Sequence, residues 1–195
     1  MDSLRLRIVA YWGFVNDELH GLYQTIYRDS RGNTKIAAVT QCEPTGARAV
    51  APCFDEPEYK AIWNMTIIHP VGTKAIANAL EISETPEPDG KWKVSRFHPT
   101  PILASYLIAL FVSEFEYEES YTQRRVRFRV WSTPETKKKR AYGLKGATAY
   151  MEFFEEYFGV QDIVTKQGRL LKAFYGFIMR RIGLPMRLRS NLKVL

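Results

Sequence analysis

The sequence predicts a mainly β protein, an antiparallel β-sandwich or saddle that is followed by an amphipathic helix and a basic tail. Three observations lead to this fold class. Apolar and charged residues alternate in short segments such as 4–8 and 125–130, which is the period of half-buried strands. Turn signals separate these segments, as is typical of sandwiches. After residue 133 the apolar spacing changes to three and four residues, the period of a helix.

Several strands are expected in the first seventy residues. Residues 4–8 alternate leucine or isoleucine with arginine and predict a half-buried strand. Residues 21–27 and 35–41 flank the sequence Asp-Ser-Arg-Gly-Asn at 29–33, which predicts a hairpin. Residues 62–69 form another β run that ends at a proline.

The strand pattern continues up to residue 132. Residues 86–90, Pro-Glu-Pro-Asp-Gly, predict a turn before a strand at 92–96. Residues 106–112 are apolar without interruption, so we expect a strand that is covered on both faces. Residues 125–130 alternate arginine with valine or phenylalanine, and we expect the arginine face to be solvated.

An amphipathic helix of about five turns is expected before Gly159, which would close it. Its apolar positions recur at helical spacing and are Leu144, Ala147 or Thr148, Met151, Phe154 and Phe158. Its acidic positions lie elsewhere around the helix and are Glu152, Glu155 and Glu156. Because the pattern changes at Thr133-Pro134, we place a domain boundary near Ser132.

Charge is distributed unevenly along the 195 residues. An apolar content of 46% and a charged content of 25% are ordinary for a soluble domain with a core. Residues 164–195 hold eight Lys or Arg and no acidic residue, whereas the other 20 basic residues accompany 21 acidic ones. A basic module that uses Arg125, Arg127, Arg129 and the tail to bind nucleic acid or anionic lipid is the least favoured function, because the tail lacks aromatics between its later arginines.

Cys42 and Cys53 lie eleven residues apart, which does not predict a disulfide-stapled module. Two buried free thiols are expected, with one bridge as the alternative. No segment approaches the length of a membrane span, and the first residues lack the apolar core of a secretory signal. A cytoplasmic location is therefore the default expectation.

The most unusual segment is residues 40–57, a connection between two apolar runs with three prolines, two cysteines and three carboxylates. It has neither helical nor alternating periodicity. A long connection of this composition is often a functional loop. The alternative is a structural crossover under a sheet, with Asp55-Glu56 as the cap that starts a helix.

This segment resembles the aminopeptidase N family of zinc metallopeptidases. The resemblance rests on Gln41-Cys42-Glu43-Pro44-Thr45, Ala47-Arg48 and Pro52-Cys53-Phe54-Asp55-Glu56-Pro57. It extends to residues 64–70, 101–109, 112–115 and 153–159, and so covers most of residues 1–160.

The resemblance implies three parts in the chain. Residues 1–132 would be an incomplete N-terminal β domain of the family, 133–163 the truncated first helix of the catalytic-type domain, and 164–195 a diverged basic tail. The family's β domain begins upstream of the segment that matches Leu4, so open sheet edges are expected. Open edges predict self-association or pairing with a full-length relative. The family includes cytosolic enzymes and membrane-anchored ectoenzymes.

The family's catalysis needs zinc, which an HExxH helix binds through two histidines one turn apart. The chain has His20, His69 and His98, with no pair at that spacing. We interpret these histidines as exposed or hydrogen-bonded residues at strand edges. We therefore expect no cofactor and no catalysis from the chain as given, although the family uses zinc.

By resemblance, the residue two places after the loop's Gln41 contacts the amino terminus of the substrate, and in this chain it is Glu43. Gln41 and Glu43 are thus the predicted substrate-binding residues, and peptide amino termini are the predicted ligand. A carboxylate suits this role because it pairs with a free ammonium group. The alternative is that Glu43 is a surface carboxylate beside Pro44.

The family's second ammonium-binding carboxylate lies in a Gly-Ala-Met-Glu-Asn strand. Lys166-Gln167 fits the pair that precedes it, and residues 177–184 fall where the strand would be, with Arg180 in place of the glutamate. Two like charges about 4 Å apart repel by roughly 4 kcal/mol at an effective dielectric near 20, so Arg180 would oppose Glu43. A diverged, misspliced or frame-shifted end is the hypothesis that follows.

Two functions remain. The first is part of an aminopeptidase N-like zinc metallopeptidase, whose family removes N-terminal residues from peptides, and this part would be inactive because it lacks the zinc helix. The alternative is a non-enzymatic module that binds peptides or partners through the loop around Glu43 and through open sheet edges.

Overall fold

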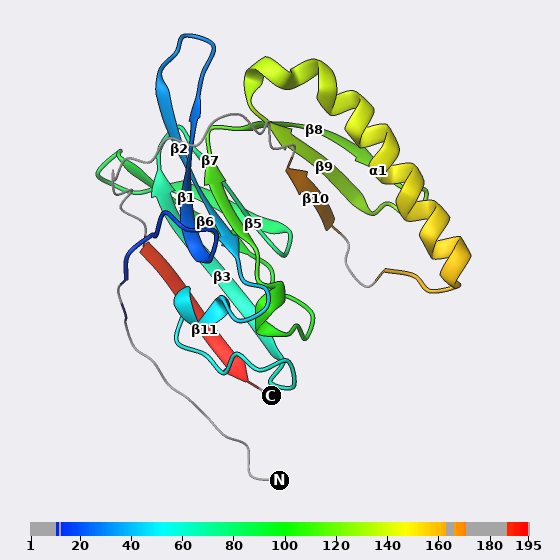
Figure 1. The fold of residues 1–195 in the computed structure, drawn as a ribbon, viewed down its shortest axis with the longest axis horizontal. Helices are drawn as coiled ribbons and strands as arrows, with labels where there is room; N and C mark the ends of the chain where they lie inside the picture. The colour runs from blue at the N-terminus through cyan, green and yellow to red at the C-terminus, as the bar shows by residue number, and fades with distance from the viewer. Residues whose placement is uncertain (1–10, 12, 163–165, 171–186, 195) are drawn as a thin grey trace. The chain divides into compact units, whose positions relative to one another are not determined.

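The computed structural model describes residue 11 and residues 13–162, 166–170 and 187–194 (Figure 1). Its strands are β1 (Gly21–Arg28), β2 (Thr34–Gln41), β3 (Ala61–Pro70), β4 (Lys74–Ala77), β5 (Glu81–Pro86), β6 (Trp92–Phe97), β7 (Leu110–Ser113), β8 (Glu116–Tyr121), β9 (Arg127–Ser132), β10 (Lys166–Leu170) and β11 (Arg187–Val194). Its helical segments are the 3₁₀ turns η1 (Ala47–Ala49), η2 (Ser105–Leu107) and η3 (Pro134–Thr136), and the helix α1 (Lys137–Phe158). By their contacts they form two units, one with β1 to β7 and β11, the other with β8, β9, β10 and α1. The sequence boundary near Ser132 stays a prediction.

Two four-stranded sheets make up the first unit among the described residues. One has the strand order β1-β2-β7-β4 and the other the order β11-β3-β6-β5. The pairs that β3, β6 and β7 make with their neighbours are antiparallel. Buried side chains from both sheets share one apolar cluster, which contains Leu22, Ala38, Ile67, Ala75, Ala77, Phe97, Leu110 and Val112. The expected antiparallel sandwich is confirmed.

The predicted hairpin joins β1 to β2. The Asp29 carboxylate accepts hydrogen bonds from the backbone N–H groups of Arg31 at 2.9 Å and Asn33 at 2.8 Å. Gly32 has a φ of +79°, a conformation that glycine adopts without strain. These local contacts explain why the turn residues predicted the hairpin. The strand predicted at 4–8 lies outside the described residues.

The apolar run at 106–112 is not one continuous strand, as had been predicted. Its start belongs to η2, and β7 begins only at Leu110. All four residues of β7 are buried, so the prediction of a strand that is covered on both faces is correct for this shorter strand. The difference has a polar cause, because the Ser105 hydroxyl at the start of η2 donates to the Asp55 carboxylate at 2.5 Å.

The second unit places α1 across a sheet with the order β10-β9-β8. The apolar residues at and before the start of β9 are buried against α1, as their alternation predicted. The cluster they form contains Val126, Phe128, Val130, Leu144 and Ala147, with Met151 packed against it.

The predicted solvated arginine face holds for Arg125, which is exposed, but is wrong for Arg127 and Arg129 in β9. The side chains of Arg127 and Arg129 are each only 14% exposed. Arg129 donates to Glu119 at 2.6 Å and lies 4.2 Å from the centre of the Tyr117 ring. The neighbouring strand β8 therefore supplies the negative charge that neutralises these arginines.

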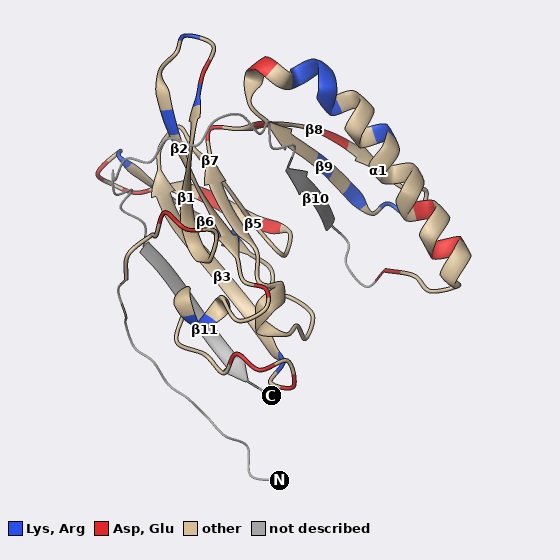
Figure 2. Ribbon diagram, in the orientation of Figure 1, with Lys and Arg blue, Asp and Glu red and all other residues tan. Residues whose placement is uncertain are grey.

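Helix α1 runs from Lys137 to Phe158 and is longer than predicted. Gly159 ends it with a φ of +63°. Basic residues lie at its start and acidic residues toward its end (Figure 2). No helix in the described ranges is long and apolar enough to cross a membrane.

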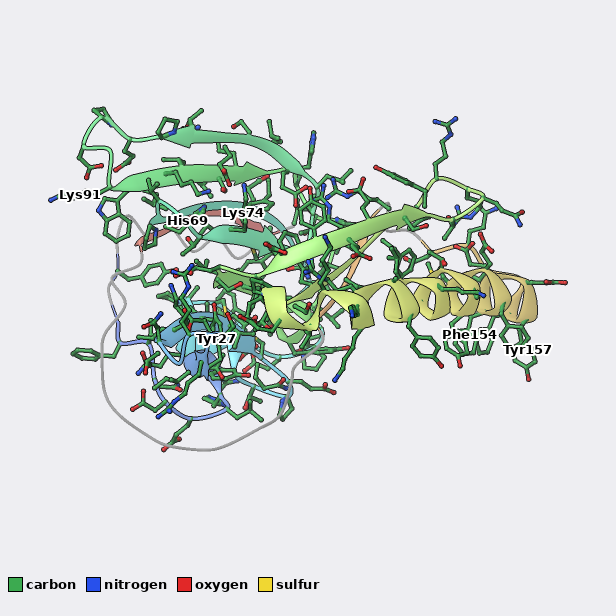
Figure 3. The ribbon with its side chains drawn as sticks, turned by 90° about the horizontal axis from the view of Figure 1, so that it is seen from above. Tyr27, His69, Lys74, Lys91, Phe154 and Tyr157 are labelled. Carbon is green, nitrogen blue, oxygen red and sulfur yellow. The ribbon has the colours of Figure 1, made fainter. Side chains whose placement is uncertain are left out.

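The predicted apolar face of α1 is correct only in its first half. Phe154 and Phe158 are 49% and 66% exposed, and Phe154 projects from the same side of the helix as Tyr157 (Figure 3). Glu152 and Glu155 face the turn between β8 and β9 instead. The Glu152 carboxylate accepts from the backbone N–H of Gln123 at 2.8 Å, four residues before β9.

The basic tail contributes strands to both units. β10 pairs with β9 in parallel, and Lys166 lies opposite Arg127. β11 pairs antiparallel with β3 along its whole length, so that this side of β3 is not an open edge. The tail is therefore partly integrated into the sheets, which its charge and composition did not predict. Residues 177–184, including Arg180, lie outside the described residues.

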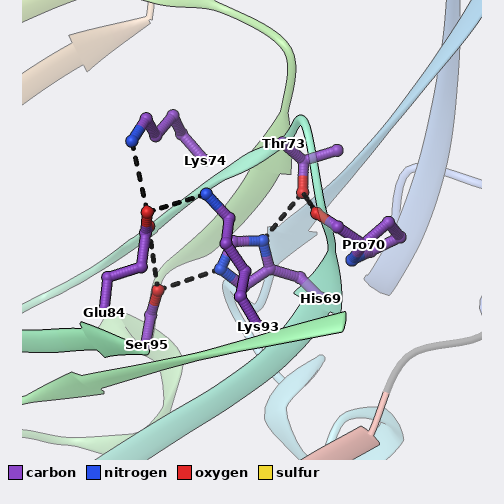
Figure 4. A network of polar contacts seen from close by, with 7 residues as sticks. All are labelled: His69, Pro70, Thr73, Lys74, Glu84, Lys93 and Ser95. Carbon is purple, nitrogen blue, oxygen red and sulfur yellow. Dashed lines mark hydrogen bonds and ion pairs between the residues drawn. The ribbon is translucent and has the colours of Figure 1, made fainter. Parts of the chain in front are cut away.

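His69 is buried in the sheet and not placed at a strand edge, because β3 lies between β11 and β6. Its Nδ1 lies 2.7 Å from Thr73 Oγ1, and that hydroxyl donates to the Pro70 carbonyl at 2.7 Å (Figure 4). Nδ1 therefore carries a proton, and Nε2 lies 2.9 Å from the Ser95 hydroxyl, which also donates to Glu84. Both ring nitrogens of the buried imidazole thus have a hydroxyl partner.

Glu84 links this histidine to two lysines. Its carboxylate accepts from Lys93 at 2.8 Å, from Lys74 at 3.3 Å and from the Ser95 hydroxyl at 3.3 Å. Burial, with Lys93 and Lys74, lowers the pKa of His69 to about 4, although Glu84 acts in the opposite direction. The folded protein thus holds His69 neutral.

We expect His69 to make the protein less stable in mild acid. Its folded-state pKa of about 4 lies below the ordinary 6.5, so the unfolded chain takes up the proton first as the pH falls. Stability should be lost between about pH 6.5 and 4, approaching roughly 3 kcal/mol. Urea unfolding of wild type and His69→Gln at pH 7, 5.5 and 4 should show their difference shrink by that amount. The exposed His98→Gln is the matched control, and parallel pH curves for wild type and His69→Gln would contradict the assignment.

Candidate functional site

The predicted functional segment connects β2 to β3, and we call residues 41–60 the site loop. Although most of it is exposed, its Cys42 and Ala47 are buried in the core. They share an apolar cluster that contains Cys42, Ala47, Ala61, Trp63 and Ile108. Buried anchors restrict the conformations of a loop, so the exposed residues between them have defined positions.

Gly46 lets the site loop approach the backbone closely. A Cβ atom at this position would lie 2.6 Å from the Gln41 carbonyl oxygen, 2.9 Å from Cys42 Cα and 3.0 Å from the backbone nitrogen of Gly21. All three atoms belong to the main chain and cannot rotate away. The Gly46 N–H also donates to the Cys42 carbonyl at 2.6 Å. The turn after β2 therefore requires glycine.

Asp55 is the polar anchor of the site loop and is only 4% exposed. Its Oδ2 accepts from the backbone N–H of Arg48 at 3.0 Å and from Arg48 Nε at 3.2 Å. Its Oδ1 accepts from the Ser105 hydroxyl at 2.5 Å. Burial acts to raise the pKa of Asp55, but the hydrogen bonds from Ser105 and Arg48 outweigh it and lower that pKa. The carboxylate is thus buried in its charged form.

The alternative interpretation of Asp55 as a helix-start cap needs correction. No helix follows Asp55 in the site loop, where residues 56–60 form turns and irregular backbone. The carboxylate instead accepts an N–H of η1, which precedes it in the chain. Sequence reasoning missed Ser105, because this partner lies 50 residues away.

The structure brings Gln41 and Glu43 together. The Gln41 side-chain amide lies 3.4 Å from the carbonyl oxygen of Glu43 and donates to it. Glu43 is exposed, and the peptide bond to Pro44 is cis. Gln41 therefore contacts the main chain of Glu43, and the Glu43 carboxylate faces solvent at the surface of an anchored turn. This arrangement fits both a cation-binding group and a plain surface carboxylate.

The two cysteines are free, as expected. Cys42 is buried, whereas Cys53 is only partly buried, which corrects the expectation of two buried thiols. Burial and the Asp55 carboxylate raise the pKa of Cys42 to about 12 and that of Cys53 to about 11. Neither thiol is therefore a reactive nucleophile at neutral pH.

The residues that the structure describes do not fit a zinc site. His69 uses both ring nitrogens within the fold, and His20 and His98 are exposed. Within the described ranges, no three His, Cys, Asp or Glu side chains gather where they could hold a metal ion. The described residues therefore offer zinc no set of ligands, and no step of a mechanism is assigned to it.

We expect Asp55→Asn to destabilise the fold by about 1–3 kcal/mol, because it removes a buried charge that accepts three hydrogen bonds. The matched control is Glu56→Gln, an exposed carboxylate 3.7 Å from Arg48 Nη2, which should change stability by no more than about 0.5 kcal/mol. Because folding lowers the pKa of Asp55 from 3.8, its contribution is complete above that pH and is lost as the pH falls through the folded-state value. Urea unfolding should show the full difference at pH 5 and a smaller one at pH 3. A pH-independent difference would contradict the role of the charge.

Comparison with known proteins finds sequence matches over most of this chain. The family model for the Peptidase M1 N-terminal domain matches residues 2–107, which include the site loop and η2. Aminopeptidase N of Haemonchus contortus is 45% identical over 184 residues, which are 94% of this chain and 19% of that protein. Aminopeptidase N of Rattus norvegicus is 36% identical over 178 residues, 89% of this chain and 18% of that protein.

A third relative carries a different name. The puromycin-sensitive aminopeptidase of Caenorhabditis elegans is 38% identical over 149 residues, 76% of this chain and 16% of that protein. The chain thus spans about a fifth of the length of the curated relatives it matches. The similarity to the first relative continues through β8, β9 and α1, beyond the residues of the family model. The chain belongs to the aminopeptidase N family of M1 peptidases.

Proposed function

We propose that this chain is the part of an aminopeptidase N-type peptidase that recognises the free amino terminus of a peptide, and that it does not hydrolyse peptides by itself. The relatives are named aminopeptidases, enzymes that act at amino termini. The observation that carries the proposal is the exposed Glu43 carboxylate on a loop that Gly46 and Asp55 hold in one conformation. A fixed carboxylate can accept from an ammonium group, which internal peptide bonds lack.

The energy of this contact limits what Glu43 can do. An exposed ion pair contributes roughly 0.2–1 kcal/mol, because water competes for both charges. Glu43 would therefore supply selectivity for a charged amino terminus and little affinity. Tighter binding would need further groups on the peptide or the protein.

The proposal that the chain is inactive rests on its residues. The sequence contains no HExxH pair, and the described histidines and carboxylates do not form a ligand set. A peptide bound at Glu43 would meet no activated water supplied by the described residues.

A module that pairs with a second protein through open sheet edges remains the alternative. The pairing of β11 with β3 occupies one of the edges that this alternative would use, and Pro86 lies at the end of the outer strand β5, where a missing N–H limits pairing. Both features weaken the alternative.

We expect Glu43→Gln to weaken binding of a short peptide with a free amino terminus by about two- to fivefold. Acetylation of the peptide should have the same effect on wild type and no further effect on the variant. Chemical-shift titration by NMR measures both, with Glu56→Gln as the control on the same loop. Equal affinity for free and acetylated peptides in wild type would refute the role of Glu43.

We expect no hydrolysis of a leucine arylamide by the purified chain, and well below one zinc ion per chain after dialysis. Metal analysis and product release are measured on the same sample. If hydrolysis is seen, Glu43→Gln distinguishes activity of the chain from activity of a contaminating peptidase, because the substitution does not change the contaminant. Stoichiometric zinc with turnover that this variant reduces would overturn the proposal.

A further inference from the structure

Glu84 links the two sheets of the first unit. It lies in β5, at the edge of the sheet β11-β3-β6-β5, whereas Lys74 lies in β4, at the edge of the other sheet. The Lys74 ammonium donates to Glu84 Oε1 at 3.3 Å, and Lys93 of β6 donates to the same oxygen at 2.8 Å (Figure 4). The side chain of Lys74 is 52% exposed and that of Lys93 only 13%. The contact that crosses between the sheets is therefore the longer and more solvated of the two ion pairs.

The second oxygen of Glu84 faces Ser95, which lies directly opposite it in the β5–β6 pair. Ser95 Oγ lies 3.3 Å from Glu84 Oε2 and 2.9 Å from His69 Nε2. A hydroxyl has one hydrogen and donates it to one acceptor at a time. Because Nδ1 of His69 carries a proton, Nε2 of the neutral ring is an acceptor, as is the carboxylate. Two acceptors therefore compete for the single hydrogen of Ser95.

Protonation of His69 removes this competition, because the imidazolium donates from both ring nitrogens. Nδ1 keeps Thr73 Oγ1 as its acceptor at 2.7 Å, and Nε2 then donates to Ser95 Oγ. The hydrogen of Ser95 is released for Glu84 Oε2. Every donor from the ring to the carboxylate now has an acceptor. The hydrogen-bond chain is thus complementary to the charged ring, although burial favours the neutral one.

Three charged side chains act on His69 among the described residues. Lys93 is opposite it in β6, and Glu84 and Lys74 come from β5 and β4. On the other side of β3, β11 places Arg187 opposite the residue that precedes His69. Successive strand residues alternate between faces, so this position belongs to the other face of the sheet. A proton on His69 would therefore set three cations around one carboxylate.

Glu84 remains an anion in mild acid. Burial acts to raise its pKa, but the hydrogen bonds from Lys93 and Lys74 outweigh burial and lower that pKa from 4.5. Of the two lysines, Lys74 leaves the carboxylate more easily, because its ammonium is farther away and reaches water without a change of fold.

We propose that protonation of His69 makes Glu84 exchange Lys74 for the hydrogen-bond chain through Ser95, and that this exchange releases the bridge between the two sheets. At neutral pH Glu84 holds Lys74, and β4 and β5 are linked. In acid the carboxylate is bound by Ser95 and Lys93, both of β6, and this link is lost. The four strands β3, β4, β5 and β6 thus form a proton-sensitive switch within one unit.

The test follows His69 and Lys74 by NMR in the full 195-residue chain between pH 7 and pH 4. The ring nitrogen shifts report protonation of His69, and ¹⁵N relaxation of the Lys74 ammonium reports whether Glu84 holds it. We expect Lys74 to lose its order with the same midpoint at which His69 gains its proton. Lys93→Met removes a cation beside the ring, so both midpoints should shift together to higher pH, where the fold is more stable.

Two variants separate the steps of the exchange. His69→Gln takes up no proton, and in Ser95→Ala the ring has no hydroxyl through which to reach Glu84. Lys74 should stay ordered in both variants over the whole range. Lys91→Met removes an exposed lysine of the same sheet region and should shift neither midpoint.

Loss of Lys74 order in His69→Gln at the wild-type midpoint would assign the change to Glu84 and overturn the proposal. A Lys74 that stays ordered after the wild-type ring is charged would overturn it as well. Circular dichroism monitors the fold at each pH. Unfolding of both wild type and Lys93→Met before His69 gains its proton would equally refute a switch within the folded chain.

Discussion

The buried carboxylate of Asp55 is the contact on which the candidate site depends. Two chain segments meet at it, the site loop, which contains both Asp55 and the η1 residue Arg48, and η2, which contributes Ser105. A buried charge is costly without partners, so the site loop and η2 are stable together only where all these donors reach the two oxygens. The exposed Glu43 is consequently positioned by contacts in which it takes no part. This separation lets the site loop present a carboxylate to solvent without losing its conformation.

The contacts of His69 are also structural. His69 occupies the centre of a sheet, and its two ring nitrogens bind Thr73 and Ser95, so neither nitrogen is free for a metal ion. A buried imidazole with a partner at each nitrogen adds specificity to the packing of β3 on β6. The contacts of His69 are thus internal to the fold, and the proposed contact at Glu43 involves neither Thr73 nor Ser95.

The features that the sequence predicts correctly are local ones. The hairpin follows from the hydrogen bonds of Asp29 within one turn, and the end of α1 from Gly159. The Asp55–Ser105 contact and the β11–β3 pair join residues far apart in the chain, and no periodicity marks them. Helical spacing put Phe154 on an apolar stripe but cannot say whether anything covers that stripe. Gln41 and Glu43 were found through a family motif, since their chemistry alone is also that of an ordinary surface.

The two halves of α1 are held by different forces, which explains the error over its aromatic residues. The first half packs apolar side chains on β9, while the second is held by Glu152 on the backbone of Gln123 and by Glu155 paired with Arg124. With these polar contacts facing the turn before β9, the aromatic rings in the second half of α1 are exposed to solvent.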